Sequence, residues 1–289
     1  MSEILRKGPD EWDMVIEPRS GIFQLHLKEV WRYKYLLWMF VKRDLVSVYK
    51  QTILGPVWFF IQPILTTITY VVIFSSIAKI STDGLPPVLF YLAGITIWNY
   101  FAETLTSTSS TFTTNSSIFG KVYFPRLVIP LSKVFSGLIK FAIQFLLFLL
   151  ALVYYVAKGA NVNPDISGII IITFIVLLIM AGLGLGLGLV LSALTTKYRD
   201  LIFLISFGIQ LGMYATPIIY PLSSVDAKYK WLVMANPMSP LIEAFRKTYL
   251  GAGSVSWGGL FYSFLFMAII MIAGTIIFNK VEKTFMDTV

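Results

Sequence analysis

Long apolar stretches without a charged side chain dominate this sequence of 289 residues. A helix needs about 20 mainly apolar residues to cross the hydrocarbon layer of a bilayer, so each uncharged run of that length is a candidate membrane span. The sequence predicts an all-α integral membrane protein with six transmembrane helices. Its six runs are residues 51–78, 84–102, 141–157 extended back past Lys140, 169–196, 201–225 and the carboxy-terminal part of 248–279.

The composition supports a lipid environment and excludes several other classes. Charged residues make up 13% of the chain, about half of their share in a soluble domain. The net charge of +8 does not indicate a nucleic-acid partner, because the basic residues gather in short segments between apolar runs. The chain has no cysteine, which excludes disulfides and thiolate catalysis. His26 lacks a second ligand, so we expect no metal site.

The distribution of Lys and Arg predicts the orientation of the chain. With the amino terminus in the cytosol, seventeen of the 23 basic residues fall inside and six fall outside, as the positive-inside rule requires. Residues 1–21 carry five acidic side chains, which disfavours a cleaved signal peptide. We therefore expect a cytosolic segment at 1–50, a transmembrane domain at 51–279 and a cytosolic carboxy terminus at 280–289.

Residues 22–50 have apolar positions at helical spacing, interrupted by Lys34. This pattern predicts an amphipathic helix on the membrane surface, with aromatic rings at the headgroups and basic residues toward anionic lipid. The alternative is a helix that packs against a soluble partner. The residues expected to define the interfacial helix are Trp31, Arg32, Trp38 and Arg43.

Three stretches resemble the membrane subunits of type 2 ABC exporters, in particular those of O-antigen and teichoic acid transporters. The first contains Arg43-Asp44, Tyr49-Lys50-Gln51, Leu54-Gly55-Pro56, Trp58 and Pro63. The second runs from Asn115 to Arg126 and continues with Ile129-Pro130-Leu131. The third is Asn236-Pro237-Met238-Ser239-Pro240, with Arg246 behind it.

The resemblance implies a permease of the bacterial inner membrane that exports a lipid-linked polysaccharide. It also implies that two copies of the chain form a homodimer and that a separate ABC ATPase subunit binds ATP and Mg²⁺. The chain has no GxxxxGK[ST] motif of its own, so any ATP that powers it must bind to another polypeptide. We accordingly expect no cofactor in this chain and no enzymatic activity of its own.

The second stretch, 115–126, begins with a cap-like Asn115-Ser116, which predicts one short helix ending before Pro125. The resemblance implies that this is the coupling helix seated in the ATPase, whereas the residues alone also fit an ordinary solvated loop. The residues that the resemblance assigns to coupling are Asn115, Ser116, Ile118, Phe119, Lys121, Tyr123 and Arg126.

The segment 221–250 predicts two short amphipathic helices broken at Asn236-Pro237. In the resembled family such helices are re-entrant and form a gate on the outer side, while a static lid fits the residues equally well. The gate residues implied here are Trp231, Asn236, Pro237, Pro240 and Arg246.

Intramembrane side chains give two further hypotheses. Glu103 is a carboxylate well within a predicted span, where a charge is costly, so it should face water or a basic partner. Aromatic rings stack on sugar rings and suit a sliding glycan, although the interfacial aromatic belt is their commoner role. The candidate channel aromatics are Trp58, Phe59, Tyr70, Trp98, Tyr214 and Tyr220.

The fourth predicted span alternates glycine with leucine from Gly182 to Gly188. This spacing places small residues on two nearly opposite faces, which predicts a helix packed closely against neighbours on both sides.

Other transport functions fit the residues less well. An ion-coupled secondary transporter normally has several intramembrane charges and repeated broken helices. In this sequence only Glu103 and a first span bent by Pro56 and Pro63 indicate such a transporter. An ABC permease for small amphiphiles is the other alternative. A membrane enzyme is disfavoured, because no paired acidic motif or nucleophile with a base is evident.

Overall fold

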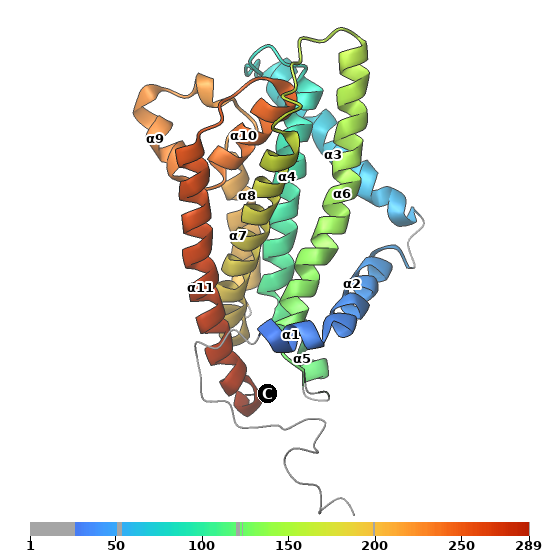
Figure 1. Ribbon diagram of the computed structural model, residues 1–289, viewed down its shortest axis with the longest axis vertical. Coiled ribbons are helices and arrows are strands. Elements are labelled where there is room, and N and C mark those ends of the chain that lie inside the picture. Colours follow the sequence, from blue (N-terminus) through green and yellow to red (C-terminus); the bar gives the residue numbers. More distant parts are fainter. Residues whose placement is uncertain (1–26, 51–53, 120–121, 123, 199, 289) are drawn as a thin grey trace, which may run out of the picture.

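The computed structural model describes residues 27–50, 54–119, 122, 124–198 and 200–288, and within these ranges the fold is all-helical without a strand. The elements form one elongated bundle (Figure 1). In chain order they are α1 (Leu27–Arg32), α2 (Lys34–Tyr49), a 3₁₀ turn (Gly55–Val57), α3 (Trp58–Tyr70), a π-helical segment (Val71–Ile77), α4 (Pro87–Ser109), α5 (Thr111–Phe119), α6 (Val128–Ala157), α7 (Ile169–Lys197), α8 (Leu201–Tyr214), a 3₁₀ turn (Leu222–Ser224), α9 (Ala227–Ala235), α10 (Ser239–Leu250) and α11 (Trp257–Thr288).

Four helical segments among the described residues are long and apolar enough to cross a membrane: Gly55–Ile77, Val128–Ala157, Ile169–Lys197 and Trp257–Glu282. Each overlaps a span expected from the sequence. The first is irregular, since Pro63 lies inside α3 and cannot donate a backbone hydrogen bond, and a π-helical segment follows Tyr70. The all-α membrane class is thus confirmed with four spans.

The other two expected spans, 84–102 and 201–225, contain helices that are not among these four. The helix expected at 201–225 ends at Tyr214, and its 14 residues reach about 21 Å, less than the hydrocarbon thickness of about 30 Å. The span expected at 84–102 is α4, which continues to Ser109. Its extra turns are polar, and hydroxyls there bond back to carbonyls of the preceding turn, as in Ser109 Oγ to Thr106 O at 2.8 Å.

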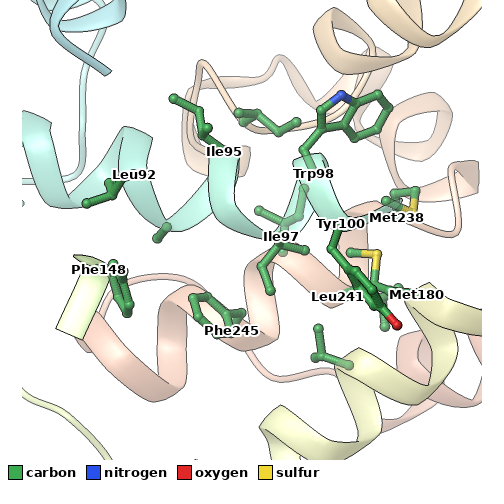
Figure 2. Packing of buried hydrophobic residues seen from close by; sticks show 14 of the residues in the cluster. Leu92, Ile95, Ile97, Trp98, Tyr100, Phe148, Met180, Met238, Leu241 and Phe245 are labelled. Atoms are coloured by element: carbon green, nitrogen blue, oxygen red, sulfur yellow. The ribbon is translucent and has the colours of Figure 1, made fainter. Parts of the chain in front are cut away.

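The long helix α4 supplies the centre of the core. Nearly every residue from Leu89 to Phe101 is buried, and α4 packs on α6, α7 and α10. Figure 2 shows Ile97 and Tyr100 of α4 near Phe245 of α10 and Met180 of α7. A helix enclosed by protein on most sides can carry polar residues that a lipid-facing helix cannot, which explains the lower hydropathy of α4.

The glycines of α7 contact two different helices, as their alternation predicts. A methyl group built on Gly184 would lie 2.9 Å from the side chain of Thr104 on α4. A methyl group on Gly186 would lie 2.9 Å from the backbone nitrogen of Met271 on α11. The expectation of a helix enclosed on both sides is confirmed, because small residues let the backbones approach closely.

The amino-terminal helix α2 packs on the amino-terminal part of α6. A break at Tyr33 divides the expected single helix into α1 and α2. Its apolar residues also occupy two sides rather than one: Val41 is fully buried, whereas Trp31 and Trp38 are 73% and 60% exposed. An ion pair of 2.7 Å between Asp44 and Lys133 joins α2 to α6.

Candidate functional site

The segment expected to couple to an ATPase is α5, at the same end of the bundle as α1 and the carboxy-terminal end of α11 (Figure 1). The helical segment α5 starts at Thr111, and a kink at Asn115 divides it into two helical parts. Asn115 has φ −115° and ψ 16°, and its Nδ2 donates to the carbonyl of Thr111 at 3.0 Å. The second part of α5 therefore begins at this kink, at the residue where the sequence predicts a helix start.

The expected coupling residues that the structure describes are all buried or half-buried. Asn115 and Phe119 are buried, and Ile118 packs partly against the same apolar cluster. Arg126 lies with its guanidinium 5.4 Å from the Phe119 ring and 3.9 Å from the Glu282 carboxylate. Ser116 is half-buried. Lys121 and Tyr123 lie outside the described residues.

Exposed residues of α5 were not among the sequence candidates. Thr114 and Ser117 are exposed, and their spacing of three residues places them on one face of the helix. Helical periodicity counted from the buried Phe112 would have identified this face.

The segment expected to form the gate contains two helices, α9 and α10, separated by Asn236-Pro237-Met238. The turn is held on both sides: Asn236 Nδ2 donates to Thr216 Oγ1 at 2.9 Å, and the Pro237 carbonyl accepts from Ser263 Oγ at 2.7 Å. Trp231 on α9 is 69% exposed, whereas Pro240 is buried at the start of α10.

Arg246 of α10, one of the expected gate residues, is fully buried. Its guanidinium donates to the carbonyls of Pro217 and Ile218, at 2.5 and 2.6 Å. It also stacks 3.6 Å from the Phe90 ring centroid of α4, and Glu243 lies 3.9 Å away. Arg246 thus connects α10 and α4 with the turn that follows α8.

The six candidate channel aromatics do not form one continuous lining within this chain. Tyr70 and Trp98 are buried, with the Tyr70 hydroxyl 3.3 Å from Met213 Sδ. Tyr214 is 45% exposed and Tyr220 is half-buried. Trp58 and Phe59 lie together at the start of α3, where both line a pocket.

This pocket has a volume of about 320 Å³ and lies between α3, α4 and α6. Glu103 of α4 accepts from Lys140 Nζ of α6 at 2.5 Å, so Lys140 is the basic partner that an intramembrane carboxylate requires. One turn away, Asn99 Nδ2 donates to Gln144 Oε1 at 3.1 Å. We name this the α3–α4–α6 pocket. Its lining comprises Trp58, Phe59, Gln62, Asn99, Tyr100, Ala102, Glu103, Thr106, Gly137, Lys140, Phe141 and Gln144.

Four polar lining residues, Gln62, Asn99, Lys140 and Gln144, were missed as site candidates. A signal for them exists in the sequence, because Asn99 and Glu103 are four residues apart, as are Lys140 and Gln144. Each pair therefore forms a polar stripe on one helix face. That the two stripes face each other follows from tertiary packing, which the spacing does not determine.

A second cavity of about 520 Å³ lies behind α8 and is lined mainly by apolar side chains of α4, α7 and α8. Of the residues described in α8, Ile205 alone is fully buried. This helix is thus weakly packed on its own bundle.

The four helical segments that are long and apolar enough to cross a bilayer define a membrane protein. The ABC-2 type transporter family matches residues 35–250, and the chain belongs to that family. O-antigen export system permease protein RfbA of Klebsiella pneumoniae is 28% identical over 255 residues, covering 87% of this chain and 94% of the relative. RfbA of Myxococcus xanthus is 27% identical over 225 residues, covering 77% and 83%. The resemblance inferred from the three stretches is confirmed.

Proposed function

We propose that this chain is the permease subunit of an ABC exporter that moves a lipid-linked polysaccharide outward across the bacterial inner membrane. The family match over residues 35–250 carries the proposal. It is supported by relatives that are named O-antigen export permeases and that align with this chain over most of their length. The apolar spans supply the membrane domain that such a subunit needs.

The proposed topology has six spans with both termini in the cytosol. Added to the four long helical segments, helix α4 would be a fifth span. The short α8, continued by residues 215–221, would be a sixth. The end that carries α1, α2 and α5 would be cytosolic, with the exposed Trp31 and Trp38 at the inner headgroups. Helices α9 and α10 would then be re-entrant from the outer side and serve as the gate.

The proposed partners are a separate ATPase and a second copy of this chain. ATP and Mg²⁺ would bind to the ATPase, and α5 would transmit its closure to the bundle through Phe119 and Arg126. The second copy would cover the exposed apolar faces of α3 and α8, where Leu65, Phe203 and Phe207 are more than half exposed. The glycan would pass between the two copies.

A copurification and deletion experiment tests this function. The chain should copurify with a separate ATPase, and lipid-linked glycan should stimulate ATP hydrolysis by the reconstituted complex. Deletion of the gene should leave the polysaccharide inside the cell, with rescue by the native chain as the control. Normal surface glycan in a strain without a redundant exporter would contradict the proposal, as would ATP hydrolysis by the purified chain alone.

A further inference from the structure

The α3–α4–α6 pocket combines aromatic faces, amides and one compensated ion pair, and none of the roles described so far uses it as a unit. We propose that it binds a sugar ring of the lipid-linked substrate, the one nearest the lipid anchor, before transport. This inference rests on the proposed function and assigns the pocket as a loading site at the inner leaflet.

The charged residues of α6 indicate how deep in the membrane the pocket lies. Lys140 and Lys158 bracket an uncharged stretch of α6, and their 18-residue separation corresponds to about 27 Å along a helix. That length is close to the hydrocarbon thickness of about 30 Å. With Lys158 at the outer surface, Lys140 and the pocket lie at the level of the inner headgroups, where the first sugar of a lipid-linked glycan also lies.

The lining has the chemistry that recognises a pyranose. Trp58 is 47% exposed and Phe59 is half-buried beside it, so aromatic surface is available to the apolar face of a sugar ring. Gln62 is exposed at the pocket, and the Asn99 and Gln144 amides lie opposite. The amides can both donate to sugar hydroxyls and accept from them, and the Glu103 carboxylate can accept from them. A pocket of about 320 Å³ falls within the range of small-ligand sites.

Charge balance favours a neutral sugar over a phosphate. Lys140 is the only cation among the described residues that line the pocket, and Glu103 accepts its hydrogen bond at 2.5 Å. A phosphate that approached Lys140 would lie beside the Glu103 carboxylate, and the repulsion between the two anions opposes its binding. Sugar hydroxyls can bond to the pair without breaking it.

The absence of cysteine from the chain allows a thiol-protection test. Thr106 lines the pocket and is exposed, so Thr106→Cys is a reporter, and the exposed Ser47→Cys on α2 is the control outside the pocket. The full-length chain in phospholipid vesicles is labelled with N-ethylmaleimide. Labelling is measured with octyl glycosides carrying glucose, galactose or mannose, and with octyl phosphate, all below the concentrations that dissolve the bilayer.

At least one glycoside should slow labelling of Thr106→Cys several-fold without slowing Ser47→Cys, and octyl phosphate should leave both rates unchanged. Adding Trp58→Leu and Gln62→Ala should raise the half-maximal glycoside concentration about tenfold, through loss of the ring contact and one hydrogen bond. Both side chains are exposed, so the variant should fold. Thr69→Ala, also exposed on α3 but outside the pocket lining, should have no effect.

The inference is overturned if no glycoside protects Thr106→Cys, if octyl phosphate protects it equally, or if protection survives the double substitution. ATPase copurification and glycan export, measured on the same protein, separate this outcome from failure of the proposed function. A chain that exports glycan with an unprotected Thr106→Cys would refute only the loading site.

Discussion

At the scale of single residues, Arg246 shows how a buried charge can organise the end of the bundle that carries α9 and α10. Removing a guanidinium from water is costly unless its donors are satisfied. The carbonyls of Pro217 and Ile218 accept from its two terminal nitrogens and the ring of Phe90 covers its face, while Nε has no hydrogen-bond partner among the described residues. Because the carbonyls follow the end of α8 and the ring belongs to α4, one side chain fixes three elements. Its planar fork suits two adjacent carbonyls better than a lysine ammonium would.

Replacement of Arg246 should therefore destabilise the protein strongly. Arg246→Met leaves the two carbonyls without their donors, and we expect a loss of about 3 kcal/mol in the free energy of unfolding. Arg246→Lys should recover little of it. The measurement is denaturant unfolding of the purified chain, with Lys247→Ala as the control, since Lys247 is exposed and bonds locally to the Gly251 carbonyl. Equal stabilities of Arg246→Met and Lys247→Ala would show that the connection is dispensable.

At the scale of elements, α7 brings α4 and α11 together through its glycines. Gly184 and Gly188 approach α4, while Gly182 and Gly186 approach α11. Gly274 of α11 lies against the Gly186 carbonyl, so the two backbones meet directly. Without a hydrophobic force between helices in lipid, close van der Waals packing of this kind holds the bundle together.

Gly186→Ala should accordingly cost about 1–3 kcal/mol in the free energy of unfolding, the usual penalty for overpacking. The added methyl group would lie 2.9 Å from a backbone nitrogen and 3.1 Å from a backbone carbon of α11, neither of which can rotate away. Gly258→Ala is the matched control, because a methyl group there meets nothing within 4 Å. Denaturation of both variants under the same conditions would decide the point, and equal midpoints would contradict the packing argument.

At the scale of the whole molecule, the sequence predicted the membrane class, four of the spans and the close packing of α7, because hydropathy and small-residue spacing are local properties. It misplaced the end of α8 and did not predict the helical turns through the Ser- and Thr-rich residues before Asn115. Ser and Thr side chains that bond to preceding carbonyls resemble a polar loop in sequence but extend a helix in structure. The sequence did not predict that two polar residues of α4 face two of α6, as in the pairs Asn99–Gln144 and Glu103–Lys140. That arrangement depends on the packing of α4 on α6, which local sequence spacing does not determine.

The packing of α5 predicts which end of the molecule the proposed ATPase contacts. At the end with α5, the Phe112, Phe119 and Phe278 rings form one apolar cluster, so a push on α5 reaches α11 directly. The exposed Thr114 and Ser117 are the part of α5 that a partner can contact.

Ser117→Arg should therefore weaken copurification of the ATPase and lower glycan-stimulated ATP hydrolysis by about tenfold, the effect of losing roughly 1.4 kcal/mol at the interface. Its thermal stability should match the native chain, because Ser117 is exposed. Ser254→Arg, an exposed position in the loop between α10 and α11 at the opposite end, should leave the ATPase bound. Loss of binding in both variants would point to a general defect, and undiminished binding in Ser117→Arg would mean that the ATPase engages a different surface.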